Sequence, residues 1–362
     1  MKFSWRWWLS VGLMGISWGI WVSQPSLLAK IPRDRASHLA QLLNPGQFNS
    51  TDKFALVKTL DESEQGHISR VNDLAISPDG KMLISASRDK TIKLWDLETT
   101  TLIATLAQDA KEIYSVAISP DGQTLVSGSA DETVKIWNLA LNQSEINSEI
   151  PIASLKHTKK AHEFAVRSVA ISPNGQTVAT ASPDRTIKLW NIATLEEEDT
   201  LKDHDSFVWA VTFSPDGRNL ASASYDETIR IWNLGGGLRK RELKGHEYPV
   251  VSVAFSPDGQ ILASGSNNGT IKLWNAREGE TISTLARHTN AVMSLAFSPD
   301  GQYLASAGAD NTIKIWNPTN GAVLEILRGH INPVTTIAFT PDGKTLVSAS
   351  ADRTIKIWQR RE

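Results

Sequence analysis

The sequence predicts an all-β fold, a seven-bladed β-propeller, and three observations carry this prediction. A four-residue turn recurs seven times, a tryptophan follows each copy at a fixed distance, and short β-rich runs fill the space between them. Repeats with a period near 40 residues are typical of propellers, in which each repeat forms one four-stranded blade. We therefore expect seven blades around a central channel.

The recurring turn is Ser-Pro-Asp-Gly or a close variant of it. Proline presets φ for such a turn, and glycine accepts the positive φ that follows. A tryptophan lies eighteen residues after each start, and successive tryptophans are 42 residues apart except for one spacing of 53. The turns begin at Ser77, Ser119, Ser172, Ser214, Ser256, Ser298 and Thr340, and the tryptophans are Trp95, Trp137, Trp190, Trp232, Trp274, Trp316 and Trp358.

One repeat contains four short runs that tight turns separate. They are 71–76, 82–86, 91–95 and 102–106. Runs of this length, rich in β-branched residues and bounded by turn residues, predict one antiparallel four-stranded sheet. The inner runs are apolar at successive positions, which is typical of strands covered on both faces. Each blade is therefore expected to pack between two neighbours.

A histidine before the first run and an aspartate between the second and third runs complete the repeat. The histidine follows glycine at His67, His246 and His330 and stands alone at His162, His204 and His288, while Asp109 and Asn268 depart from the pattern. The tryptophan is followed by aspartate at Trp95-Asp96 and by asparagine in most other repeats. Over about 310 of 362 residues, this pattern resembles the WD-repeat family.

The resemblance implies that histidine, aspartate, a strand serine and tryptophan form a buried hydrogen-bonded chain in each blade. In the first repeat its members would be His67, Asp89, Ser85 and Trp95. The second and fifth blades, with Asp109 and Asn268, should be tied less well. The structural ties expected on this basis are His67, Asp89, Trp95, Asp131, Trp137, His162, Asp184, Trp190, His204, Asp226, Trp232, His246, Trp274, His288, Asp310, Trp316, His330, Asp352 and Trp358.

This histidine, aspartate and serine set looks like catalytic machinery, but we interpret it as structural. It recurs in most repeats, whereas an active site normally occurs once, and a catalytic serine needs an exposed hydroxyl and an oxyanion hole. The chain has no cysteine and no metal-spaced histidine or carboxylate motif. We expect no catalytic residue, no metal and no cofactor. The alternative is a small-ligand-binding or hydrolytic propeller that uses the central channel.

The two ends of the repeat region predict how the ring closes. The last repeat ends shortly after Trp358 and has no fourth run, while the run 54–60 precedes the first histidine, where a fourth strand belongs. We expect 54–60 to complete the last blade, which removes an open sheet edge. The propeller domain is then 54–362, and we expect it to be monomeric.

The N-terminal segment has a different composition. Lys2 and Arg6 precede an uncharged run over 7–22, and Ala29 follows it, as in an export signal. We expect 1–29 to be a signal peptide, with a membrane anchor through 7–22 as the alternative, and 30–53 to be a linker with one short helix. The chain is thus interpreted as an exported, bacterial-type member, periplasmic in location. The membrane would be contacted only through an uncleaved segment.

Candidate binding residues come from positions that vary between repeats, around the start of the innermost run and before the turn aspartate. The resemblance implies that the face carrying the histidine and aspartate turns contacts partners. With a net charge of −2, the chain has no basic field for nucleic acid, so we expect a protein or peptide partner. An alternative is that some of these residues only pack across the channel. The candidates are Arg70, Arg88, Tyr114, Arg167, Phe207, Trp209, Tyr225 and Tyr248.

The unequal spacing predicts two charged loops on the same face. The longer repeat is expected to extend a basic loop over 156–160, and the loop 61–64 that enters the first blade is acidic. Opposite charges at two rims could orient a partner, whereas a merely solvated surface is the simpler interpretation.

Overall fold

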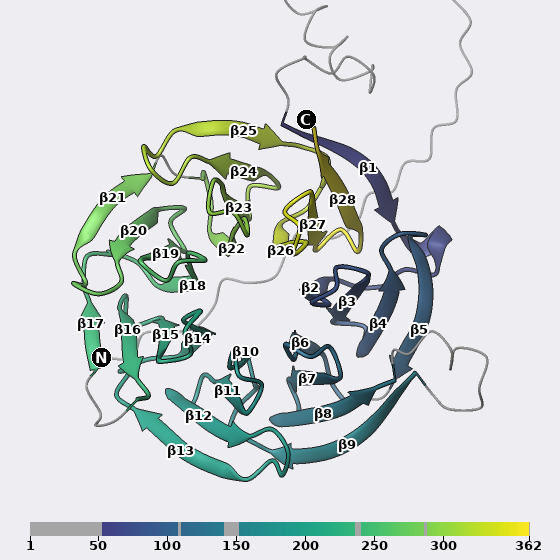
Figure 1. Cartoon of the computed structure of the whole chain (residues 1–362), viewed down its shortest axis with the longest axis horizontal. Helices are drawn as coiled ribbons and strands as arrows, with labels where there is room; N and C mark the ends of the chain where they lie inside the picture. Colours follow the sequence, from purple (N-terminus) through teal and green to yellow (C-terminus); the bar gives the residue numbers. More distant parts are fainter. Residues whose placement is uncertain (1–52, 108–109, 141–151, 236–239, 286–287, 362) are drawn as a thin grey trace, which may run out of the picture. The chain divides into compact units, whose positions relative to one another are not determined.

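The computed structural model describes residues 53–107, 110–140, 152–235, 240–285 and 288–361. These residues form seven four-stranded antiparallel sheets arranged as blades around a channel (Figure 1). In blades one to six the first strand in sequence is innermost, whereas in the seventh the first strand in sequence is outermost, and the predicted seven-bladed propeller is confirmed. The predicted segment 1–29, the predicted linker 30–53 except for Lys53, and Asp109 lie outside the described residues.

Blades one to four use sixteen strands in sequence order. Those of blades one and two are β2 (Val71–Ile76), β3 (Met82–Ser87), β4 (Thr91–Asp96), β5 (Thr101–Ala107), β6 (Ile113–Ile118), β7 (Thr124–Ser129), β8 (Thr133–Leu139) and β9 (Ala153–Lys160). Those of blades three and four are β10 (Ser168–Ile171), β11 (Thr177–Ala181), β12 (Thr186–Asn191), β13 (Glu197–Lys202), β14 (Val208–Phe213), β15 (Asn219–Ser224), β16 (Ile229–Asn233) and β17 (Lys240–Leu243).

Blades five to seven follow the same order until the last strand, which comes from the other end of the chain. Their strands are β18 (Val250–Phe255), β19 (Ile261–Ser266), β20 (Ile271–Asn275), β21 (Thr281–Leu285), β22 (Val292–Phe297), β23 (Leu304–Gly308), β24 (Ile313–Trp316), β25 (Val323–Leu327), β26 (Val334–Phe339), β27 (Thr345–Ser350), β28 (Ile355–Arg360) and β1 (Phe54–Leu60). A 3-10 turn, η2 (Glu62–Glu64), links β1 to the first blade.

The apolar core consists of seven clusters, one between each pair of neighbouring blades. Strand β3 is buried along its whole length, as expected for a strand covered on both faces. Between blades seven and one, Leu60 and Trp95 share a cluster with Val347 and Ile355, so the join between the chain ends has a core like the others. Burial of apolar surface between blades therefore continues around the whole ring.

Strand β1 completes the seventh blade. It pairs antiparallel with β28 from Phe54 opposite Arg360 to Leu60 opposite Ile355. The Glu325 carboxylate of blade six accepts the backbone N–H groups of Lys53 at 3.0 Å and Phe54 at 3.1 Å. The start of β1 is therefore bonded to the sixth blade as well as to the seventh.

The Ser-Pro-Asp-Gly turns form the face opposite the histidine and aspartate turns. In the first of them, the Ser77 hydroxyl donates to the Asp79 carboxylate at 2.5 Å and accepts the Met82 N–H at 2.9 Å. Gly80 has φ of +72°, which favours glycine, and the place a side chain would occupy faces the ring of Pro341. Such glycine and proline contacts recur between neighbouring blades, so the repeated turn also spaces the blades.

The prediction of a basic loop over 156–160 is wrong. These residues belong to β9, which pairs with β8 as far as Thr133 opposite Lys160. Strand pairing satisfies backbone N–H and C=O groups that a loop would leave to water. None of the helices in the part of the chain that the structure describes is long and apolar enough to cross a bilayer.

Deletion of residues 54–60 should destabilise the ring and cause aggregation, because β28 becomes an open edge and the seventh blade loses an outer strand. We expect a lower melting temperature by calorimetry and larger species by size-exclusion chromatography. A deletion of equal length over 44–50 is the control. A 54–60 deletion that stays monomeric with an unchanged melting temperature would contradict the closure mechanism.

Candidate binding face and channel mouth

A hydrogen-bonded chain runs through the first blade from the tryptophan to the turn aspartate. The Trp95 indole N–H donates to Ser85 Oγ at 2.8 Å, and Ser85 Oγ lies 2.8 Å from His67 Nε2. His67 Nδ1 lies 2.7 Å from Asp89 Oδ2. Burial alone would raise the pKa of the Asp89 carboxyl, but hydrogen bonds from His67 and Thr91 outweigh it and lower the pKa to about 2. Asp89 is therefore an ionised acceptor.

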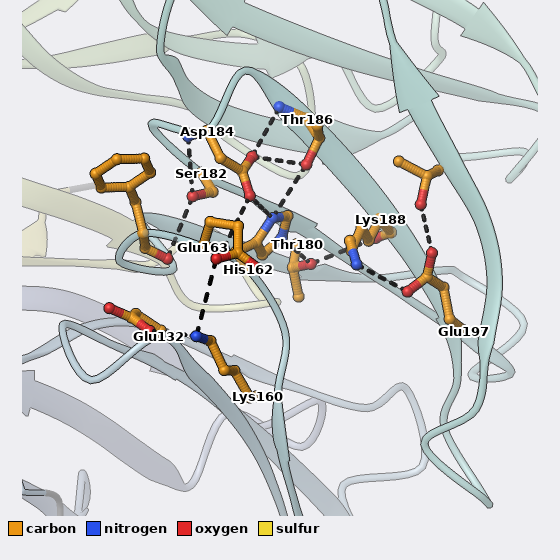
Figure 2. A network of polar contacts seen from close by, with 12 residues as sticks. Glu132, Lys160, His162, Glu163, Thr180, Ser182, Asp184, Thr186, Lys188 and Glu197 are labelled. Carbon is orange, nitrogen blue, oxygen red and sulfur yellow. Dashed lines mark hydrogen bonds and ion pairs between the residues drawn. The ribbon is translucent and has the colours of Figure 1, made fainter.

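The third blade contains the same chain with threonine in place of serine (Figure 2). His162 lies between Asp184, at 2.8 Å from Nδ1, and Thr180, at 2.7 Å from Nε2. The Trp190 indole N–H donates to the Thr180 hydroxyl at 2.9 Å. At the surface beside this chain, Lys160 pairs with Glu132 at 3.0 Å, which joins the second blade's outer strand to its own turn.

Corresponding contacts occur in the fourth, sixth and seventh blades. There the distances from histidine Nδ1 to the aspartate are 2.7 to 3.0 Å, and those from Nε2 to the serine are 2.7 to 2.9 Å. The residues that join in these blades are His204, Ser222, Asp226 and Trp232, then His288, Ser306, Asp310 and Trp316, and then His330, Ser348, Asp352 and Trp358.

In the second and fifth blades the hydrogen-bonded chain from tryptophan to the turn residue is shorter. In the second, Trp137 donates to Ser127 at 3.2 Å, and Asp131 lies 3.8 Å from Lys135. In the fifth, His246 and Trp274 both contact Ser264, but Asn268 instead accepts the N–H of Thr270. Burial lowers the pKa of His246 to about 4, and no aspartate counteracts that shift.

These chains hold buried hydroxyls and cannot act as nucleophilic sites. Ser85, Ser222 and Ser306 are fully buried, and the tryptophan N–H occupies the oxygen that would attack. Substrate could not reach them without opening the blade. Within the described ranges there is also no group of three or more metal-ligating side chains.

The same turn aspartates hold the backbone that enters each blade. Asp89 accepts the N–H of Ile68 at 3.1 Å, and Asp352 accepts that of Ile331 at 3.0 Å. The residue after the histidine is therefore fixed on the face of the ring. We call this surface, formed by the loops before the innermost strands and the turns with the aspartates, the His/Asp face.

A β-bulge at the start of the innermost strand directs one side chain from most blades toward the channel. The register shifts between Val71 and Asp73 in β2, and equivalent shifts occur in β6, β14, β18, β22 and β26. A bulge adds a residue to one strand and re-aims its side chain. The residues at these positions are Asn72, Tyr114, Trp209, Val251, Met293 and Thr335, and Arg167 lies at the matching place before β10.

Four of the predicted binding residues meet at one cavity of about 240 Å³ in the channel. Arg70, Tyr114, Arg167 and Trp209 all line it. The Arg167 guanidinium carbon lies 4.0 Å from the Tyr114 ring centroid and 3.9 Å from that of Trp209. Cations stacked on aromatic faces in this way are attracted by the ring electrons. These four side chains are therefore neighbours in the channel, and their role in binding a partner stays a prediction.

The stack continues toward the rim of the fourth blade. Tyr225 lies 5.1 Å from Trp209 and 5.9 Å from Phe207, measured between ring centroids. Arg88 stands at the rim, where its Nε donates to Glu112 at 3.2 Å, and Tyr248 is half exposed on the fifth blade. The eight predicted residues therefore divide into two groups. Four line the channel cavity, namely Arg70, Tyr114, Arg167 and Trp209, and four lie outside it, namely Arg88, Phe207, Tyr225 and Tyr248.

Sequence reasoning missed Asp73, which joins three blades at the channel wall. Its carboxylate accepts the Ser115 hydroxyl at 2.8 Å and the Val116 N–H at 3.0 Å, both from the second blade. It also accepts the Leu74 N–H at 2.9 Å and the Thr336 hydroxyl, of the seventh blade, at 3.2 Å. The signal available in the sequence was that this position holds serine or threonine in most other repeats and aspartate once.

Sequence reasoning also missed three exposed apolar side chains on the His/Asp face. Ile68 is 70% exposed, Phe164 is 59% exposed and Ile331 is 78% exposed. Each lies one or two residues after a tie histidine, which is the signal that could have identified it. With Phe207 and Tyr248, they place exposed apolar side chains on five of the seven blades of this face.

Comparison with known families agrees with this geometry. A model described as the WDR3 second beta-propeller domain matches residues 92–323, and the WD domain, G-beta repeat matches residues 55–96 and 321–359. The chain belongs to the WD-repeat family. Both matched descriptions are of propeller repeats, and neither names a catalytic domain.

Individual relatives of this WD-repeat protein match over parts of their length. The small ribosomal subunit protein RACK1 of Schizosaccharomyces pombe is 31% identical over 134 residues, 37% of this chain and 41% of that protein. Transducin beta-like protein 3 of Mus musculus is 31% identical over 34% of this chain and 17% of its own. U3 small nucleolar RNA-associated protein 13 of Saccharomyces cerevisiae is 30% identical over 39% and 18%. The matched part is less than half of each relative.

Asn268→Asp should strengthen the fifth blade of this WD-repeat protein. The new carboxylate would accept from His246 Nδ1, stabilising the fold by about 1 kcal/mol and raising the pKa of His246 from about 4. The pKa of His246 is lower in the folded chain than in the unfolded chain, so the unaltered protein loses stability as pH falls from 6.5 to 4. The Asn268→Asp variant should lose less stability over the same pH range. Urea unfolding at pH 7.5 and pH 5, with NMR titration of His246, measures both effects.

The matched reverse variant is Asp310→Asn in the sixth blade, where His288 Nδ1 lies 3.0 Å from the carboxylate. It should lower stability by a similar amount and lower the pKa of His288. Equal stability of Asn268→Asp and the unaltered chain at both pH values would refute this account of the fifth blade.

Proposed function

We propose that this WD-repeat protein is a non-enzymatic scaffold that binds a protein or peptide partner on its His/Asp face. One observation carries the proposal. Among the residues that the structure describes, every exposed large apolar side chain outside the outer strands lies on this face. The other eight lie on β1, β5, β9, β21 and β25. A partner that covers this face would bury these side chains, and burial of apolar surface favours association.

The side chains at the centre of this face support the same proposal. Tryptophan, tyrosine and arginine dominate the energetics of many interfaces, and here they are stacked at the channel mouth. Because ring contacts and blade ties already fix these side chains, a partner pays little to order them. The rigid ring thus supplies a prearranged surface.

A small-ligand site in the channel is the second candidate, supported by the cavity of about 240 Å³. Pockets for drug-sized ligands usually measure about 300–1,000 Å³, so this cavity better suits one inserted side chain. Two relatives have names that refer to a ribosomal subunit and to nucleolar RNA. For this chain a protein partner is favoured over RNA, since its net charge is −2.

Replacing Phe164 or Ile331 by Asp, or Trp209 by Ala, should abolish partner binding. The aspartates put a charge on the apolar face, and the alanine removes the ring that stacks on Arg167. Affinity purification with quantitative mass spectrometry should find proteins that the unaltered chain retains and these variants lose. The control is Ile282→Asp, a comparably exposed residue on the outer strand β21, which should retain them.

Melting temperatures within a few degrees of the unaltered chain would exclude unfolding as the cause. If the three variants on the His/Asp face retained the same proteins as the Ile282→Asp control, the His/Asp face would not be the binding surface.

We also propose that the chain is an exported, bacterial-type member of the family with a periplasmic location. This rests on residues 1–29 alone, where two basic residues precede an uncharged run and a small residue follows. N-terminal sequencing of the purified protein should give a start near Lys30. An intact N-terminus together with recovery in the membrane fraction would favour the anchor through 7–22 instead.

A further inference from the structure

Two arginines at the channel mouth lack a negatively charged partner. The Nε atoms of Arg70 and Arg167 are buried without a hydrogen-bond partner. No carboxylate lies within 4.0 Å of either guanidinium in the described ranges, whereas Arg88 at the rim pairs with Glu112 at 3.2 Å. The channel mouth therefore differs from the rim, where the positive charge is already neutralised.

Unpaired charges in such a place are costly. Burial lowers the pKa of both Arg70 and Arg167, and their mutual repulsion lowers that of Arg167 further. Arginine nevertheless stays protonated in proteins, so the charges persist and require an anion or water. An anion that enters the cavity would be attracted strongly by these two arginines, because folding has already removed water from around their charges.

The stack around Arg167 determines which part of the guanidinium a ligand can reach. The rings of Tyr114 and Trp209 lie 4.0 and 3.9 Å from the guanidinium carbon. They cover its faces, and its Nε is buried, which leaves the Nη–H groups for a ligand. These groups can bind a carboxylate in a two-point hydrogen bond.

The charge of the cavity lining fits a single negative charge. The charged side chains that line it are Arg70, Asp73 and Arg167. All four polar contacts of the Asp73 carboxylate come from donors, namely two hydroxyls and two backbone N–H groups. Burial raises the pKa of Asp73 more than these four donors lower it. When Asp73 is ionised, the lining carries one net positive charge. A carboxylate neutralises it, whereas a doubly charged phosphate exceeds it.

We propose that the channel mouth binds the carboxylate of an aspartate or glutamate side chain presented by an acidic peptide segment of the partner. The acid enters the cavity of about 240 Å³ and meets Arg70 and Arg167, while flanking residues of the segment contact the exposed apolar side chains of the His/Asp face. This inference rests on the proposed function, since it names the chemistry that the same face recognises.

The test is the selection of a random 12-residue peptide library on the full chain. Synthetic copies of the selected peptides are then measured by isothermal titration calorimetry. We expect an acidic residue shared by the selected peptides, and we expect its replacement by Gln or Asn to weaken binding by about 10-fold or more. This replacement leaves the protein unchanged, so folding cannot confuse the result.

Two protein variants locate the acid. Arg70→Met and Arg167→Met should each weaken binding by a similar factor, and each should lose the difference between the acidic peptide and its amide form. Arg277→Met is the matched control and should change affinity by less than about threefold, because Arg277 is exposed, pairs with Glu278 and lies in the turn between β20 and β21, away from the His/Asp face.

Three outcomes would overturn the proposal. Peptides that require Phe164 and Ile331 but bind equally well without an acid would refute the acid while leaving the proposed function intact. A phosphoserine in place of the acid that binds more than about 10-fold tighter would show that the site takes a dianion. Selected peptides that are indifferent to the Phe164→Asp and Ile331→Asp variants would instead refute the proposed function itself.

Discussion

Every blade of this protein has two apolar faces, and this constraint determines the rest of the structure. A sheet that is apolar on both sides must be covered on both, so one blade requires a neighbour on each side. A linear array would leave a terminal face exposed, whereas a ring leaves none. The seven apolar clusters, including the one shared by Leu60, Trp95 and Ile355, are the physical result. Pairing of β1 with β28 keeps this ring from opening at its join.

Within that ring, the polar residues serve two levels of organisation. The chain of His67, Ser85, Trp95 and Asp89 joins strands within a blade, and Asp89 also fixes the backbone of Ile68 on the surface. Asp73 joins neighbouring blades at the channel wall. Residues that resemble a catalytic set thus act as supports for a display surface. The side chains that differ between repeats are therefore held in place by hydrogen bonds that recur in most blades.

Much of the fold could be predicted from the sequence because each repeat specifies the strands and turns of one blade, and the number of repeats specifies the number of blades. The turn and the tryptophan define each blade, and the missing last strand identifies 54–60 as the closing one. The meeting of Arg167 with Trp209 depends on a bulge that sequence periodicity does not reveal. The exposure of Ile331 was missed because isoleucine is normally a buried residue. The prediction of a loop over 156–160 assigned the last of the extra residues of the longer repeat to the turn after the strand, whereas β9 extends through them.

The position of β1 in the last blade has a consequence for the order in which the molecule can form. Phe54 and Arg360 are opposite one another although 306 positions separate them. Bringing the ends of such a long chain together costs about 5 kcal/mol of chain entropy, which each completed blade reduces in advance by shortening the free segment. At a synthesis rate of about 5–20 residues per second, β1 waits roughly 15–60 s for its partner strand. Throughout that interval the first strand made is the last to be paired.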